Sequence, residues 1–395
     1  MHPAKKISTK LACIAFCSLL AISYSHAGYS DSTQYQTKGY EYKLQKTGKG
    51  VIDDATIDEI AADLANNKKP IYSLIVDNDS LAQNALEKLL NALKTNNTIQ
   101  DLSFLNFSGE NITKISKTLE TDLLTYRQSK QIRWIDSVAF TNTHEDTTTP
   151  LEKSVVESIS KLIISGLARL NLRGNNIGDK GMVTIAKELP GSILTHLNLS
   201  NCKIEDGGIA ALANALRKGN DRLTHLNLDK NNFAASSVIE IITAANLYNL
   251  SNLSLAENNI GDNEDILGGI FTHYARHGSN RIIYNINLAK NNISSKGAIK
   301  IAETALAYSR YFTLNLAYNN IDFAGAEAIA RSKAWSESSE TIINLKGNNI
   351  GLNGLMALVK TAPTEQKLAG LDLEMMFIAA NHAAPTEVTK GHEEL

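Results

Sequence analysis

Two histidines, His196 and His225, occupy the same place in two copies of the hexapeptide LTHLNL. If the copies form neighbouring strands, the two imidazoles lie side by side, about 5 Å apart. Asp229 follows His225 at a spacing that returns to the same side of a strand. Two imidazoles and a carboxylate could hold a metal ion or act as an acid and a base, as in a metal-dependent hydrolase. Duplication of one unit also aligns like residues, and it explains the pair more simply than a metal site does.

The other residue types that could do chemistry have simpler structural explanations. His273 and His277 are four residues apart, but the zinc-protease pattern needs Glu where Tyr274 stands. A helix end before Gly278 explains both histidines. Cys202 stands where other copies have Asn, so we expect a buried structural thiol. With no phosphate loop and no nucleophile elbow in the sequence, we predict no catalytic residue, no metal and no cofactor.

These residues belong to a repeat of the form LxxLxLxxNxI with a period of about 28 residues. Strong copies begin at Leu167, Leu194, Leu223, Leu250, Ile283, Tyr311 and Glu340, and weaker ones at Ile71, Ile99, Ile135 and Leu368. Positions 4 and 6 of each copy alternate with polar residues, which is typical of a strand that buries one side.

A helix is predicted after each strand. In the second strong copy Ile209, Leu212, Ala213 and Leu216 form an apolar stripe at helical spacing. One strand and one helix cannot bury their own apolar faces, so we expect the units to stack and to share one continuous core.

The unit resembles the ribonuclease-inhibitor-like leucine-rich repeats. The resemblance rests on the motif and on a glycine near the start of each helix, at Gly181, Gly208, Gly297, Gly325 and Gly354. It covers roughly residues 71–380 and is strongest over 167–360; Glu340 and the unit at Ile135, which lacks the Asn, depart from the pattern. It implies an α/β horseshoe of about eleven units, with parallel strands on the concave face and helices on the convex face.

The segments outside the array also carry predictions. Lys5, Lys6 and Lys10 precede the apolar stretch 11–22, and Ser25-His26-Ala27 suits cleavage near Ala27, so residues 1–27 read as a signal peptide. The apolar stretch is too short for a membrane anchor. After cleavage only Cys202 remains, which excludes an internal disulfide. We expect residues 28–70 to be a lead with a capping helix, and 381–395 to be a polar tail.

The last four residues, HEEL, resemble endoplasmic-reticulum retrieval signals. We predict a secreted or periplasmic protein, with the endoplasmic-reticulum lumen as the alternative if this tail is a retrieval signal. The sequence names neither its organism nor its partner.

Two sets of polar residues follow the repeat. The Asn at position 9 is predicted to be structural, because its amide can satisfy backbone groups in the turn between units; the set is Asn175, Asn231, Asn258, Asn291, Asn319 and Asn348. Asn also recurs at position 5, where bonding between neighbouring strands would favour it. The concave face is the predicted partner-binding surface, through Arg169, Arg173, His196, His225, Asp229, Lys230, Glu257, Tyr318 and Lys346.

The composition narrows the class of partner. The formal net charge is −2, which gives no global field that would attract nucleic acid or an anionic membrane. Charges of both signs with few aromatics favour a protein partner. We therefore predict an exported, non-enzymatic interaction protein, which a bacterium could direct at a host. An alternative is a GTPase regulator, because the array also resembles the Ran GTPase-activating proteins.

Overall fold

The computed structural model describes residues 40–44, 52, 54–67, 71–82, 84–129, 135–144, 149–219, 222–244, 250–263, 267, 285–304, 313–336, 341–363 and 371. They fall into two compact units. The N-terminal unit holds the described residues from 40 to 258, and the C-terminal unit those from 259 to 371. The predicted signal peptide, the polar tail, His273 and His277 lie outside the described residues.

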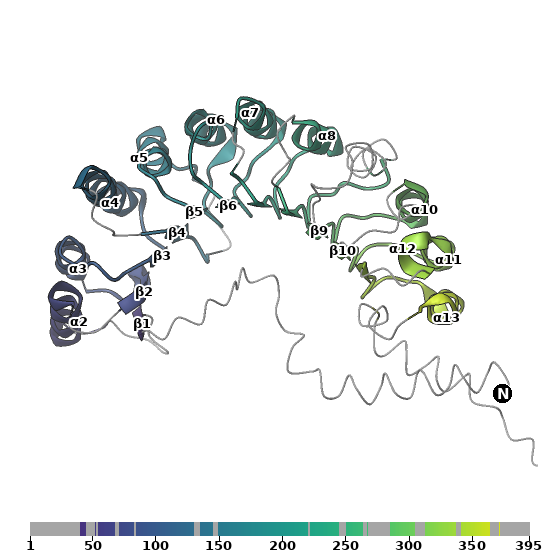
Figure 1. Cartoon of the computed structure of the whole chain (residues 1–395), viewed down its shortest axis with the longest axis horizontal. Helices are drawn as coiled ribbons and strands as arrows, with labels where there is room; N and C mark the ends of the chain where they lie inside the picture. The colour runs from purple at the N-terminus through teal and green to yellow at the C-terminus, as the bar shows by residue number, and fades with distance from the viewer. Residues whose placement is uncertain are drawn as a thin grey trace, which may run out of the picture. The chain divides into compact units, whose positions relative to one another are not determined.

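The N-terminal unit alternates strands with helices. Its strands are β1 (Tyr40–Leu44), β2 (Ile71–Asp77), β3 (Asp101–Leu105), β4 (Ser137–Thr141), β5 (Arg169–Asn171), β6 (His196–Asn198), β7 (His225–Asn227) and β8 (Asn252–Ser254). Its helices are α2 (Asp54–Asn66), the short η1 (Asn78–Ser80), α3 (Ala85–Leu93), α4 (Gly109–Ser129), α5 (Lys153–Ile164), α6 (Gly178–Glu188), α7 (Asp206–Arg217) and α8 (Ala235–Thr243). Each strand pairs in parallel with the next along the chain. Within this unit the helices form the outer layer and the strands the inner one (Figure 1).

The C-terminal unit repeats the same plan. Its strands are β9 (Asn285–Asn287), β10 (Thr313–Asn315) and β11 (Ile342–Asn344), and its helices are α10 (Ser295–Thr304), α11 (Phe323–Arg331), α12 (Lys333–Ser336) and α13 (Gly351–Thr361). The three strands pair in parallel, and α11 packs against α10 and α13.

The core of each unit lies between its strands and its helices. At positions 4 and 6, Leu197 and Leu199 are buried, as are Leu314 and Leu316 in the C-terminal unit. The stripe predicted on the helix after Leu194 is buried in α7 along its whole length. The predicted fold, an α/β leucine-rich-repeat solenoid, is therefore confirmed.

The start of the array differs from the sequence-based expectation. Residues 28–70 were expected to be a lead with one capping helix, yet 40–44 form strand β1, paired in parallel with β2. An unpaired edge strand leaves a row of backbone groups without partners, and β1 supplies them for β2. Helix α2 lies where the capping helix was expected, and it packs against α3. Of the unit expected from Leu368, only Leu371 is described, and it is buried.

The turns after β5 to β11 share one backbone feature: position 8 of the repeat has a positive φ. The residues are Gly174, Asn201, Lys230, Glu257, Lys290, Tyr318 and Gly347, with φ between 52° and 80°. The position-8 N–H donates to the position-7 carbonyl of the next repeat at Gly174, Asn201, Lys230, Lys290 and Tyr318, and the bond from Asn201 to Asp229 measures 2.8 Å. The left-handed turn therefore extends the inter-unit hydrogen bonding beyond the strand itself.

Gly174 is required for space as well as for conformation, and this can be tested. A Cβ on Gly174 would lie 2.0 Å from the carbonyl oxygen of Asn142, whereas one on Gly191, also at positive φ, would meet nothing within 4 Å. We expect Gly191→Ala to cost about 1–2 kcal/mol of unfolding free energy. Gly174→Ala should cost about 1–3 kcal/mol more, because backbone must move. Urea denaturation of both variants measures the difference; equal losses would contradict the close approach.

Candidate functional site

The strand face is the side of each sheet that points away from the helices. Because side chains alternate along a strand, burial of position 4 places positions 3 and 5 on this face. Strand register aligns the position-3 residues of the N-terminal unit into one row. From β3 to β8 this position-3 row consists of Asp101, Ser137, Arg169, His196, His225 and Asn252.

The row begins with an ion pair that reaches across β4. The guanidinium Nη2 of Arg169 lies 3.0 Å from Oδ1 of Asp101, and both side chains are partly exposed. Nearby, partial burial raises the pKa of Asp136, with Arg169 opposing the shift and Asp101 adding to it. Arg169 is thus paired with Asp101 and lies beside His196 of the neighbouring strand.

The two histidines stack face to face. Their ring centroids are 3.9 Å apart and their planes differ by 10°. Each Nδ1 lies 2.8 Å from the hydroxyl of the preceding threonine, Thr195 or Thr224. Those hydroxyls donate to backbone carbonyls of the preceding strand, so each Nδ1 carries the proton and donates to the threonine oxygen. The Nε2 of His225 then accepts from Nδ2 of Asn252 at 2.7 Å. These contacts hold both rings in one orientation.

Asp229 does not complete a metal site with these histidines. Its Oδ1 accepts from the Ser254 hydroxyl at 2.6 Å and from the Ala256 N–H at 2.7 Å. Burial raises the pKa of Asp229, and these hydrogen bonds partly oppose the shift. In the part of the chain that the structure describes, no group of three or more His, Cys, Asp or Glu side chains could hold a metal. The hydrolase alternative therefore has no metal site at His196, His225 and Asp229.

The asparagines at position 9 link consecutive units through both ends of the carboxamide. Oδ1 of Asn231 accepts from the N–H groups of Cys202 and Ile204, each at 3.1 Å. Its Nδ2 donates to the carbonyls of Leu199 and Leu228, each at 2.9 Å. Asn175, Asn258, Asn291, Asn319 and Asn348 make bonds of the same kind. These side chains serve the backbone and lie inside the fold rather than on the strand face.

Cys202 occupies position 9 of its repeat, where the other strong copies have asparagine. Its side chain is fully buried, and Sγ donates to the carbonyl of Leu172 at 3.2 Å. Burial raises the pKa of the thiol, so it stays protonated. A buried neutral thiol is a poor nucleophile, and its role here is structural.

The asparagines at position 5 bond within their own unit. Oδ1 of Asn198 accepts from the N–H of Ser200 at 3.0 Å, and the same contact occurs two residues after Asn171, Asn227, Asn287, Asn315 and Asn344. Bonding between neighbouring strands was expected to favour these residues; the observed contact instead closes the turn that ends each strand.

A column of aspartates at the start of the helices was missed by the sequence analysis. Oδ1 of Asp179 accepts from the Glu205 N–H at 2.8 Å, and Oδ1 of Asp206 accepts from the Ala234 N–H at 2.7 Å. In the C-terminal unit, Asp262 accepts from Ser294 and Asp322 from Ser295. The recurrence of Asp one or two residues after position 11 was the available signal.

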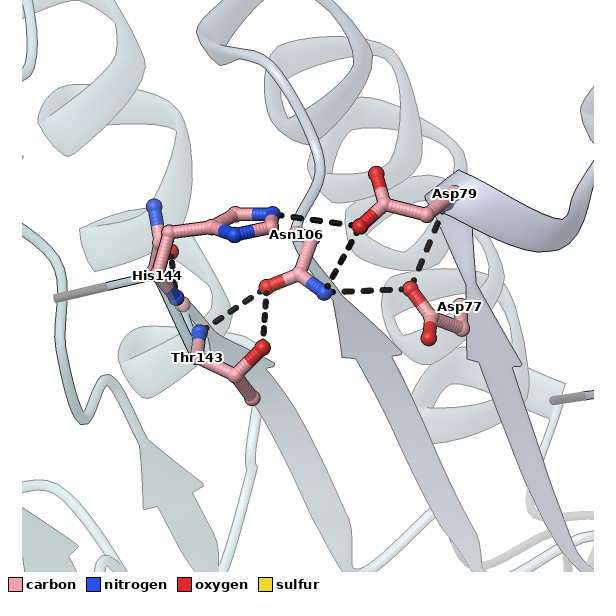
Figure 2. A network of polar contacts seen from close by, with 6 residues as sticks. Asp77, Asp79, Asn106, Thr143 and His144 are labelled. Atoms are coloured by element: carbon pink, nitrogen blue, oxygen red, sulfur yellow. Dashed lines mark hydrogen bonds and ion pairs between the residues drawn. The ribbon is translucent and has the colours of Figure 1, made fainter. Parts of the chain in front are cut away.

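A second polar cluster lies where β2, β3 and β4 end (Figure 2). The Nδ2 of Asn106 donates to Asp77 at 3.1 Å and to Asp79 at 3.4 Å, while its Oδ1 accepts from the Thr143 N–H at 2.8 Å. Nε2 of His144 lies 3.1 Å from Asp79. The cluster joins the turns of three repeats that match the motif weakly. No shared motif therefore predicted these contacts from the sequence.

The remaining predicted binding residues are divided between the two units. Arg173, Lys230 and Glu257 follow strands of the N-terminal unit, and Nζ of Lys230 lies 3.6 Å from Glu257. Tyr318 and Lys346 are exposed on the C-terminal unit. No helix among the described residues is both long and apolar enough to cross a membrane.

A comparison with protein-family models agrees with the repeat seen in the structure. A family model described as Leucine Rich repeat matches residues 167–186, 193–213, 286–302, 309–330 and 341–359. A chain in the crystal structure of the Rad7 and Elc1 complex in yeast is similar at 16% identity and a TM-score of 0.38, with 76% of this chain and 85% of that chain covered. The curated proteins contain no match to the sequence. The chain therefore carries leucine-rich repeats; the ribonuclease-inhibitor-like subfamily and the likeness to Ran GTPase-activating proteins stay predictions.

The contribution of Asn231 to stability can be compared with that of the next residue, Asn232. Asn231→Ala would leave two N–H groups and two carbonyls without this partner, and we expect a loss of about 3 kcal/mol or more of unfolding free energy. Asn232 is exposed, and its side chain makes one long hydrogen bond, at 3.4 Å to Glu205. Asn232→Ala should stay within about 0.5 kcal/mol. Urea denaturation followed by circular dichroism compares them, and similar losses would refute the structural role of the column.

The raised pKa of Asp229 predicts a dependence of stability on pH. In the pH range above the ordinary aspartate value, the folded state binds more protons at this site than the unfolded chain does, so stability falls as pH rises. Asp229→Asn keeps the accepting Oδ1 and removes the charge. The unfolding free energy of the variant, relative to the native chain, should therefore rise between about pH 4 and pH 7. A difference that is constant with pH would contradict this.

Proposed function

We propose that this chain is an exported protein-binding solenoid that receives a partner on its strand face. Leucine-rich repeats generally present an extended surface of this kind to other proteins. Export is supported by the basic and apolar pattern of residues 1–27, and a host-directed role would follow from export by a bacterium. The strand face is where binding is expected, because the opposite side of each unit is covered by amphipathic helices.

The proposal rests on the position-3 row, whose polar side chains are held in place by contacts with one another and with the backbone. Arg169 is held by Asp101, and the imidazoles of His196 and His225 are stacked and hydrogen-bonded. None of these side chains fills the core, yet each has a fixed orientation. Polar groups that are ordered before binding lose less entropy when a partner docks. Charges of both signs on this face suit a polar protein surface.

The proposal is tested with paired variants of the N-terminal unit. Arg173→Ala with Lys230→Asn removes two exposed cations beside the strand face, and Asn tolerates the positive φ at Lys230. Lys180→Ala with Lys187→Ala removes two exposed cations from α6. Affinity capture from candidate host and periplasmic extracts, quantified by mass spectrometry, identifies proteins retained by the native chain.

We expect the first pair to reduce capture of the specific partner about tenfold or more, since arginine is frequent among residues that dominate binding. The α6 pair should leave capture unchanged, and both pairs should keep the thermal unfolding midpoint. Loss of capture with the α6 pair alone would show that the helices form the working surface.

A further inference from the structure

Three successive repeats of the C-terminal unit have a lysine, a tyrosine and a glycine at position 8, in the turn after the strand. Nζ of Lys290 lies 5.9 Å from the centroid of the Tyr318 ring, within the range of a cation–π contact. A Cβ on Gly347 would lie 2.4 Å from Cδ1 of Tyr318. The ring therefore rests on the backbone of Gly347, and only a glycine leaves room for it there.

Tyr318 is an unusual residue for its place. Its φ is 55°, in the left-handed region that bulky residues rarely adopt, and glycine fills the equivalent position at Gly174 and Gly347. The residue is nevertheless 51% exposed. A large aromatic held in an unfavourable conformation and left in solvent contributes little to the core, so its use lies at the surface.

The surroundings of Tyr318 are cationic and rich in hydrogen-bond donors. The three strands with their turns, residues 285–292, 313–320 and 342–349, contain two lysines and no Asp or Glu. Both lysines, Lys290 and Lys346, are exposed. The carboxamide oxygens of Asn315 and Asn344 accept from the backbone N–H groups of Ala317 and Lys346, which turns their Nδ2 donors to the face.

We propose that Lys290, Tyr318 and Lys346, together the Tyr318 platform, bind an acidic segment of a protein partner. Carboxylates of the segment would lie on the two ammonium groups and accept from the asparagine Nδ2 groups, while its apolar stems cover the tyrosine ring. The inference rests on the proposed function, since it assigns partner chemistry to one part of the strand face. Two cations and one aromatic are too few for a nucleic-acid track, and the sequence pI of about 6.5 agrees.

The probe is a fluorescein-labelled peptide of six glutamates, measured by fluorescence polarisation with the chain lacking residues 1–27. The control ligands are the six-glutamine peptide and an oligothymidine of equal length. We expect the glutamate peptide to bind more tightly than both, and added salt to weaken its binding because the contacts are exposed charges.

Variants assign the binding to the platform. Tyr318→Gly places at this turn the residue used at Gly347, so the fold is retained, and Lys290→Asn with Lys346→Gln removes both charges. Each should weaken glutamate-peptide binding about tenfold or more. The matched control is Lys296→Gln with Lys333→Gln, two exposed lysines on α10 and α12 of the same unit, which should bind like the native chain.

Equal binding of the glutamine peptide, tighter binding of oligothymidine, or unchanged binding by the platform variants would each overturn the inference. The proposed function is judged separately, by partner capture with variants of the N-terminal unit. A chain whose partner capture depends on Arg173 and Lys230, but which ignores the glutamate peptide, would retain the proposed function and lose only this inference.

Discussion

The hydrogen bonds of the position-9 carboxamides are the contact on which the rest of this molecule depends. From β5 onward the strands are only three residues long, so sheet pairing alone gives few bonds between units. Asn231 and Asn319 each accept from N–H groups of the preceding repeat and donate to carbonyls of their own and the preceding repeat. A buried backbone group without a partner is costly, so a side chain that satisfies several of them holds consecutive units in one register.

That register creates the strand face. Within a sheet, each strand pairs with the next at equal positions of the repeat. A polar side chain at position 3 therefore lies directly beside the position-3 side chain of the next strand. The stack of His196 on His225 and the reach of Arg169 to Asp101 both follow from this alignment. A binding surface of this kind can vary from unit to unit, because its side chains take no part in the core that builds it.

The two units use the same scaffold to display different chemistry. The N-terminal unit presents both signs of charge and a pair of imidazoles, and its Asp77–His144 cluster joins three turns. The three described strands of the C-terminal unit present lysine, tyrosine and asparagine without a carboxylate. In both units the backbone at position 8 is left-handed. This position is glycine in two repeats, at Gly174 and Gly347, and a residue with a side chain in the others. At the position-8 residues other than Gly174 and Gly347, substitution changes the surface without disturbing the buried leucines.

The sequence by itself determined the parts of this protein that repeat. Its period located the strands and helices, the buried leucines and the asparagine column, and it placed His196 beside His225, because stacked units force equal positions into contact.

The tertiary structure decided what does not repeat. Strand β1 was invisible as a copy of the motif, and Asp229 turned toward Ser254 and Ala256 rather than toward the histidines. The Asp77–His144 cluster joins residues at different positions of three repeats, and the period alone did not indicate that the Tyr318 ring would lie on the backbone of Gly347. Contacts of this kind depend on the packing of particular side chains across neighbouring turns, and only the folded chain specifies that packing.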